Sequence, residues 1–351
     1  MADTITRTRL RRLAELRPER GRVLSVFYNL DPGEFATAAA RATELNSVMT
    51  AAAHRIEAED GLDHEERQAL RADVERVREA LGDTGLPANG TRGLAVFACG
   101  PADLLEVVRL PIPVESRVVL DTHPCVDPLL RPGAGERWTV LLVNRRSARI
   151  FTGGVEALEE TDRITDDVHQ QHDQGGWSQA NYQRSVEQEK RHHVAGVLDV
   201  LFTRFKQRSF HHLVVGAPQE LVAEVESGLH PYLRERLAGR VTVDVENAST
   251  DDVRTAATAA ADEHRAGVER AALDRMAQGV GRGERGASGI AQVQAALEQA
   301  RVEILLLADD FDAPERDALV EQALTQSAQV LVVSHHGDLA VHGGVGAVLR
   351  F

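Results

Sequence analysis

The sequence predicts a protein of the α/β (α+β) class with more than one domain. Short runs rich in β-branched and aromatic residues alternate with longer segments whose apolar residues recur every three or four positions, as in helices layered on sheets. The chain has 351 residues, whereas one hydrophobic core usually serves about 100 to 200 residues. Length alone predicts two or three domains, and the order of elements predicts three, over residues 1–134, 135–249 and 250–351.

The first domain is predicted to be a sheet with two helices packed on it. RVLSVFYNL (22–30) is a strand pattern, and the DPG that follows it is a turn signal. From 34 to 81 the apolar spacing is helical, with a break near Gly61, which indicates two amphipathic helices. GLAVFACG, LLEVVRLP and SRVVLD are expected strands, and RPGAGE predicts a turn or linker at the end of the domain.

The second domain begins with an expected hairpin, WTVLLVNR and SARIFTGG, and VEALEETDRI is consistent with a third strand. Residues 165–179 are polar and lack either periodicity, which predicts a loop. A long amphipathic helix follows, then a buried strand (HHLVVGAP), a short helix opened by Pro218 and a closing strand (RVTVDVE). The apolar stripe of the long helix is Tyr182, Val186, Val194, Val197, Leu198, Leu201, Phe202 and Phe205.

The third domain is expected to be a small α/β/α sandwich. A helix from about Asp251 to Gln278 precedes two helix–strand pairs, IAQVQAALEQA with VEILLLAD and APERDALVEQALTQ with VLVVSHH, and GAVLRF closes the chain as a strand. Asp312 and Glu315 have the spacing of a capping box, with Pro314 in the first helical turn.

Composition narrows the class of protein. A net charge of −14 argues against indiscriminate nucleic-acid binding. Residues 1–22 nevertheless carry seven arginines against three acidic residues, which fits either a local anion contact or a solvated helix face. No apolar stretch is long enough to span a bilayer, and the basic N-terminus lacks the apolar core of a secretory signal, so neither a membrane nor an exported location is expected. Cys99 and Cys125 are expected to be reduced, buried thiols.

The loop sequence Gly175-Gly176-Trp177-Ser178-Gln179 resembles the Gly-Gly-Gln loop of archaeal and eukaryotic class-1 peptide release factors, and more closely the Gly-Gly-x-Ser-Gln variant of their bacterial relatives. It leads into an arginine-bearing helix (NYQRSVEQEKRHH), as in those relatives. The resemblance implies a three-domain architecture with an RNase H-like middle domain and a C-terminal domain that is similar to kink-turn-binding ribosomal proteins. It also implies a cytoplasmic protein that acts at the ribosome, with ribosomal RNA and peptidyl-tRNA as partners and no cofactor.

The implied chemistry is hydrolysis of the ester between peptide and tRNA. Gly175 and Gly176 lack Cβ atoms and can approach RNA closely. Gln179 would orient a water and stabilise the tetrahedral intermediate through its backbone N–H. Trp177 is expected either to stack on a base or to pack on its own domain, with Ser178 beside it. Phosphate contacts are expected from basic residues of the helix: Arg184, Lys190, Arg191, Arg204, Lys206 and Arg208.

Two departures from the family pattern shape the functional expectation. Trp177 and Ser178 separate the glycines from Gln179, and residues 1–133 contain no Asn-Ile-Lys-Ser codon-reading motif. A codon-independent role is therefore expected: either peptidyl-tRNA hydrolysis on stalled ribosomes, or non-catalytic occupation of the tRNA site as a hibernation or protection factor. Delivery by a translational GTPase, as in some relatives, is left open.

Other patterns are interpreted as structural. The GxGxxG of residues 281–286 follows a helix, whereas dinucleotide binding requires a preceding buried strand. Asp309, Asp310 and Asp312 form an acidic cluster after a predicted strand, which is interpreted as structural rather than as a metal or substrate site because Asp312 is expected to cap a helix. The histidines lack the spacing of a zinc site, and they are His169, His172, His192, His193, His211, His212, His335 and His336.

Overall fold

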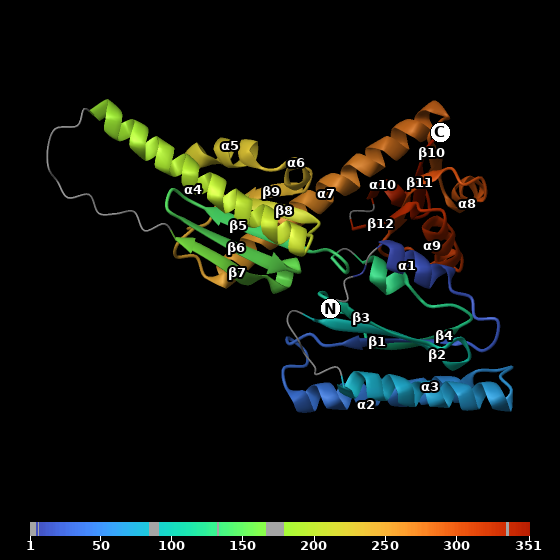
Figure 1. The fold of residues 1–351 in the computed structure, drawn as a ribbon. Helices are drawn as coiled ribbons and strands as arrows, with labels where there is room; N and C mark the ends of the chain where they lie inside the picture. Colours follow the sequence, from blue (N-terminus) through green and yellow to red (C-terminus); the bar gives the residue numbers. More distant parts are fainter. Residues whose placement is uncertain (1–4, 6, 84–90, 132, 166–178, 335–336) are drawn as a thin grey trace. The chain divides into compact units, whose positions relative to one another are not determined.

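A computed structural model describes residues 5, 7–83, 91–131, 133–165, 179–334 and 337–351 (Figure 1). The chain forms two compact units, one of Met1–Gly135 with Ala266–Phe351 and one of Glu136–Arg265. The described residues contain three sheets, one within each of the three predicted segments. The fold class is therefore α/β, as predicted, and the domain boundaries at 134 and 249 stay a prediction. Within these described ranges, no helix has the length and apolar character needed to cross a bilayer.

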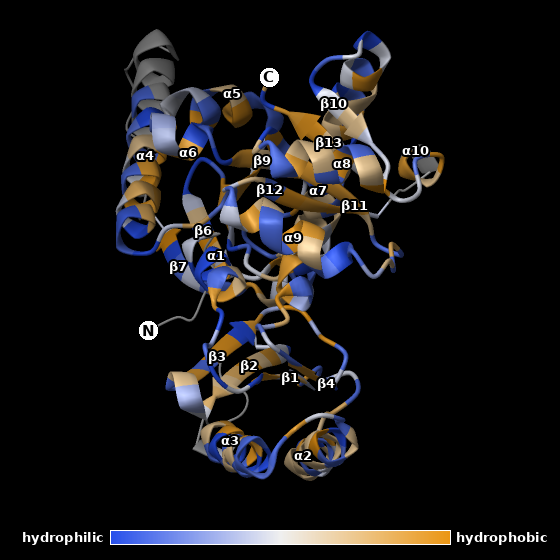
Figure 2. Ribbon diagram, turned by 90° about the vertical axis from the view of Figure 1, so that its right-hand side faces the viewer, coloured by the Kyte–Doolittle hydropathy of each residue, from blue (hydrophilic) through white to orange (hydrophobic). Residues whose placement is uncertain are grey.

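The N-terminal sheet of the first unit is antiparallel, with the order β3-β2-β1-β4. Two helices lie side by side on one face of it (Figures 1 and 2), where they bury alternate strand residues such as Leu24 and Val26. Thr37 begins the first helix because its hydroxyl accepts from the Ala40 N–H at 3.1 Å. The elements are β1 (Val23–Asn29), α2 (Ala38–Ala58), α3 (His64–Asp83), β2 (Gly93–Cys99), β3 (Leu104–Leu110) and β4 (Arg117–Asp121), with short 3-10 turns η1 (Gly100–Ala102) and η2 (Asp127–Leu130).

The C-terminal sheet of the same unit has the order β10-β13-β11-β12, in which β11 and β12 are parallel and the other pairs antiparallel. Figure 2 shows its strands as predominantly hydrophobic, because helices cover both faces. The last part of α7 packs on one face and α8 and α9 on the other, which forms the expected α/β/α sandwich. The elements are α7 (Thr250–Arg282), β10 (Gly286–Ser288), α8 (Ile290–Glu298), β11 (Val302–Ala308), α9 (Arg316–Thr325), β12 (Gln329–Val333), α10 (Gly337–Ala340) and β13 (Val345–Leu349).

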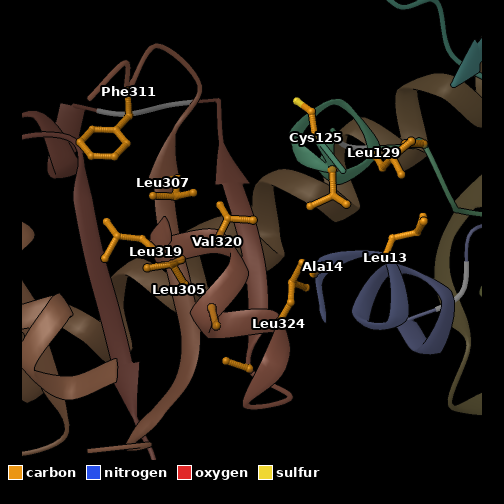
Figure 3. Packing of buried hydrophobic residues seen from close by; sticks show 14 of the residues in the cluster. Leu13, Ala14, Cys125, Leu129, Leu305, Leu307, Phe311, Leu319, Val320 and Leu324 are labelled. Atoms are coloured by element: carbon orange, nitrogen blue, oxygen red, sulfur yellow. The ribbon is translucent and has the colours of Figure 1, made fainter. Parts of the chain in front are cut away.

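One hydrophobic cluster joins these two sheets into a single unit. Figure 3 shows Leu13 and Leu129 facing the α9 residues Val320 and Leu324 across it. Ion pairs border the cluster, since Arg316 donates to Asp127 at 2.8 Å and Arg17 contacts Glu321. Both cysteines are buried and free, and burial raises the pKa of Cys125 to about 11, which keeps it a thiol.

The arginines near the N-terminus contact other parts of the same unit. In α1 (Arg7–Glu15), Arg9 and Arg12 both reach the buried carboxylate of Glu106, and Arg9 also donates to the Val107 carbonyl at 2.9 Å. Arg11, Arg17 and Arg22 pair with Glu15, Glu321 and Glu59 respectively. These contacts favour a structural role for the basic segment over an anion contact.

The second unit is a five-stranded mixed sheet with the order β7-β6-β5-β8-β9. β5, β6 and β7 are antiparallel neighbours, and β8 and β9 continue the sheet in parallel with β5. Strand residues alternate between two cores: Leu141 faces α4 and α5, while Val140 faces α7. The elements are β5 (Trp138–Val143), β6 (Ser147–Gly153), η3 (Val155–Ala157), β7 (Glu159–Thr165), α4 (Gln179–Gln207), β8 (His212–Gly216), α5 (Gln219–Gly228), α6 (Pro231–Arg234) and β9 (Leu237–Val241).

Two local expectations require correction. The last strand of this sheet spans Leu237–Val241 and shares only its last two residues with the predicted RVTVDVE (240–246), because its pairing with β8 ends where Gly216 meets Val241. Asp312 is not the cap of α9: the chain first makes a turn, with the Arg316 N–H donating to the Ala313 carbonyl, and the helix begins with no side-chain cap.

Glycines at the end of α7 and at the start of β10 have a packing role. A Cβ atom on Gly286 would lie 2.5 Å from the Met276 carbonyl oxygen, and one on Gly279 would lie 2.6 Å from the backbone of Arg285. Glycine at both positions lets β10 run directly against the end of α7. This close approach accounts for Gly286, the last glycine of the GxGxxG pattern, whereas a Cβ atom on Gly281 or Gly283 would meet nothing within 4 Å.

Candidate RNA interface of the middle unit

The predicted hydrolytic loop ends at the start of α4. Gly175, Gly176, Trp177 and Ser178 lie outside the described residues, and Gln179 is the first residue of the helix. The first four N–H groups of an α-helix have no acceptor within the helix, and the helix dipole places partial positive charge there. The backbone of Gln179 therefore belongs to a helix end of the kind that binds anions.

The second half of α4 is anchored on the sheet. Val194, Val197 and Leu201 are buried against β5, β6 and β8, and the buried stripe agrees with the predicted periodicity. Lys190 precedes this stripe and forms an ion pair with Glu224 of α5, with Nζ 3.0 Å from the carboxylate. Its side chain is only 12% exposed, so Lys190 also ties α4 to α5.

The other predicted phosphate contacts fall into different environments. Arg191 is exposed, and the side chain of Arg184 is outside the described residues. Arg204 donates through Nε and Nη2 to one carboxylate oxygen of Asp162, at 3.1 and 2.6 Å. Lys206 and Arg208 are exposed at the end of α4. The charge of Arg208 also affects Arg137, because burial, and then the positive charge of Arg208, lowers the pKa of Arg137.

Aromatic residues of the predicted apolar stripe gather at this same end of α4. Phe202 and Phe205 are half-buried, and each ring makes a cation–π contact. Lys206 Nζ lies 4.9 Å from the centroid of the Phe202 ring, and the Arg236 guanidinium lies 4.7 Å from the centroid of the Phe205 ring. His230 stacks on Phe202, with centroids 3.9 Å apart and planes at 16°. We call Phe202, Phe205, Lys206, His230, Tyr232 and Arg236 the aromatic–basic patch. The signal for it in the sequence is HPYLRER (230–236), which mixes aromatic and basic residues.

A second cluster lies where the chain enters β5 and β8. The His212 ring stacks on Trp138 at 4.3 Å and meets His264 of α7 at 5.0 Å. Glu136 lies 3.7 Å from His212 and accepts from the Trp138 indole at 3.3 Å. Although burial raises the pKa of Glu136, contact with His212 outweighs it and leaves that pKa below its usual value.

The sequence contains several histidines, which are potential zinc ligands. His169, His172, His335 and His336 lie outside the described residues, and His193 is buried in α4. Within the part of the chain that the structure describes, no three or more histidine, cysteine, aspartate or glutamate side chains are arranged to hold a metal ion.

The middle unit combines a mixed sheet with a long helix whose first residue is the glutamine of a Gly-Gly-x-Ser-Gln sequence. Residues 124–262 match the family described as bacterial archaeo-eukaryotic release factor family 10. The chain is a relative of the release factors through this segment, which contains the whole of the mixed sheet, α4 and the residues before it.

Similarity to individual proteins is more limited. The pelota homolog of Archaeoglobus fulgidus is 33% identical over 88 residues, which are 22% of this chain and 26% of that protein. The chain thus matches about a quarter of the length of this curated relative.

Among solved structures, an archaeal translation termination factor, aRF1, is 20% identical with 99% of each chain covered and a TM-score of 0.28. Dom34 from S. cerevisiae is 8% identical, with 74% of this chain and 81% of that chain covered and a TM-score of 0.46. Because both TM-scores are below 0.5, neither superposition supports a conclusion about function.

Proposed function

We propose that this protein is a cytoplasmic, codon-independent ribosome factor that enters the tRNA A site and hydrolyses the peptidyl-tRNA ester on stalled ribosomes. One observation carries the proposal: the segment Gly175–Gln179 lies inside the matched region 124–262 and ends on the first residue of α4. Ribosomal RNA and peptidyl-tRNA are the proposed partners.

The proposed chemistry uses the start of α4. Attack of water on the ester places negative charge on the carbonyl oxygen, and N–H donors fixed in position stabilise such an oxyanion. The Gln179 N–H and the partial positive charge at the helix end are suited to this task. The Gln179 side chain would orient the attacking water, and the two glycines would allow the loop to approach RNA.

Two variants separate the backbone and side-chain roles. Gln179→Ala removes the amide side chain and keeps the N–H, whereas Gln179→Pro also removes the N–H at a first helical position, which tolerates proline. We expect peptide release from stalled ribosomes to fall in both, and by about 100-fold or more in Gln179→Pro, the usual cost of one lost oxyanion donor. Gln188→Ala, an exposed change on the same helix, is the matched control. Full release activity in Gln179→Pro, with unchanged ribosome co-sedimentation, would refute the proposed chemistry.

A second candidate function is non-catalytic occupation of the tRNA site. It is favoured by the placement of Gln179 in a helix, with two residues between it and the glycine pair. The same assay decides between them: ribosome binding with no release by the unaltered chain supports the protective role.

We also propose that a translational GTPase delivers the protein. Recruitment to ribosomes in a cell extract should then depend on GTP. Equal recruitment with GDP would contradict this part of the proposal.

A further inference from the structure

We propose that the aromatic–basic patch binds an unstacked RNA base together with its flanking phosphates. This surface is separate from the proposed hydrolytic end of α4. Gln179 and Gln207 bound a helix of 29 residues, which at 1.5 Å per residue places its ends about 40 Å apart. The inference concerns RNA affinity, so it does not require that the protein hydrolyse an ester.

The rings of the aromatic–basic patch differ in solvent exposure. Tyr232 is 58% exposed, and its ring centroid lies 5.1 Å from that of the half-buried His230. His230 in turn stacks on Phe202, whose ring is nearly parallel to that of Phe205 at 6.4 Å. An exposed ring backed by other rings offers a flat face to a nucleobase, which every base can use because every base has a π-face.

Main-chain contacts hold Tyr232 in place. It lies in α6, a single turn in which the His230 side chain accepts from the Tyr232 N–H at 3.3 Å and Leu233 is buried in the core. Arg236 donates to the carbonyl oxygens of Tyr232 and Phe210, at 2.5 and 3.1 Å. The backbone that bears the Tyr232 ring is therefore already ordered, which lowers the conformational entropy lost on binding.

The charge of the patch favours a polyanion. Segments 202–210 and 230–236 together contain five arginine or lysine residues and one glutamate, in a chain whose net charge is −14. Arg204 is paired with Asp162. Arg234 and Arg236, by contrast, donate to neutral carbonyl oxygens, and Lys206 lies over a ring. Carbonyl and ring contacts orient these cations without cancelling their charge, so they can attract phosphates.

The experiment measures affinity of the full chain for a fluorescently labelled single-stranded oligouridine by anisotropy at low salt. We expect Tyr232→Ala to weaken binding about tenfold, since stacking is lost, while Tyr232→Phe binds as the unaltered chain. Tyr232→Leu, which keeps an apolar side chain and loses the flat ring, should resemble Tyr232→Ala. Val341→Ala, which changes an exposed apolar residue of the other unit, is the control and should have no effect.

The phosphate contribution is tested by salt dependence. Lys206→Gln with Arg208→Gln should reduce the slope of log affinity against log salt by about 1.4, because each phosphate contact with single-stranded nucleic acid contributes about 0.7.

Unchanged affinity in Tyr232→Ala, with a native circular dichroism spectrum, would overturn the proposal. Loss of ribosome binding in the variant with both Lys206→Gln and Arg208→Gln, with unaltered RNA affinity, would also overturn the proposal, because it would indicate an acidic protein partner. RNA binding through Tyr232 without peptide release would keep this inference and refute only the hydrolytic function.

Discussion

The buried guanidinium of Arg149 donates from both Nε and Nη2 to a single carboxylate oxygen of Glu160, at 3.1 and 2.5 Å. Its third nitrogen, Nη1, donates to the carbonyl of Ala248 at 2.7 Å. Arg149 thereby links β6 to β7 and to the segment before α7. Its side chain is 5% exposed, and a buried charge of this kind requires its partner.

Glu160→Gln should therefore destabilise the middle unit. Loss of one partner of a buried ion pair costs about 3 kcal/mol or more, and urea unfolding at pH 7 measures it. Glu159→Gln, an exposed change next in the chain, is the control. Equal stability of Glu160→Gln and the unaltered chain would show that Arg149 needs no counter-charge.

The same pair predicts a pH dependence. Hydrogen bonds from Arg163, and then from Arg149, lower the pKa of Glu160 from 4.5 to about 2. A carboxylate with a depressed pKa in the folded state contributes stability that is present above pH 4.5 and is lost as pH falls through about 2. The stability difference between the unaltered chain and Glu160→Gln should shrink steadily below pH 4.5. A constant difference from pH 6 to pH 3 would contradict this assignment.

The contact of Arg9 and Arg12 with Glu106 predicts that the N-terminal arginines stabilise the first unit more than they bind RNA. Glu106→Gln should lower the unfolding midpoint, because two guanidinium groups lose a buried counter-charge. Glu115→Gln, at an exposed position, should leave the midpoint unchanged. In the same preparations, Arg12→Gln should co-sediment with ribosomes as well as the unaltered chain does. A strong loss of ribosome binding would restore the anion-contact interpretation.

The ion pair between Lys190 and Glu224 separates a structural from an RNA-binding role of Lys190. If it mainly ties α4 to α5, Lys190→Met and Glu224→Gln should both speed amide hydrogen exchange in α4 by a similar factor. An RNA contact would instead appear as weaker RNA binding in Lys190→Met alone. The exposed change Glu220→Gln on α5 is the control for both measurements.

The cluster around His212 predicts that acid weakens the middle unit. Burial, and then the nearby His212, lowers the pKa of His264 below 6.5. A histidine with a depressed pKa favours the folded state while it is neutral, so stability is complete above pH 6.5 and is lost as pH falls through the folded-state pKa. The thermal midpoint should drop between pH 7.5 and 5.5, and His264→Gln should reduce that drop. His54→Gln, which alters an exposed histidine of the other unit, should not.

Local patterns predicted most elements of the fold. The two helices around the break at Gly61, the hairpin before residue 154 and the sandwich after α7 all follow from periodicities of two and of three to four, which are properties of neighbouring residues. Predictions that depended on distant partners were less accurate. The end of β9 is set by β8, which precedes it by more than 20 residues, and the start of α9 is set by a turn that replaced the expected cap.

The sequence by itself determined the family resemblance, through the Gly-Gly-x-Ser-Gln segment, and the amphipathic character of α4. Tertiary structure alone decided where charges and rings meet. It paired the arginines of α1 with Glu106, bound Arg204 to Asp162 and stacked His230 on Phe202 across 28 positions of the chain. The physical reason is that hydrophobic periodicity selects which face of an element is buried, while the partner of a charge or ring on the other face depends on how separate elements pack.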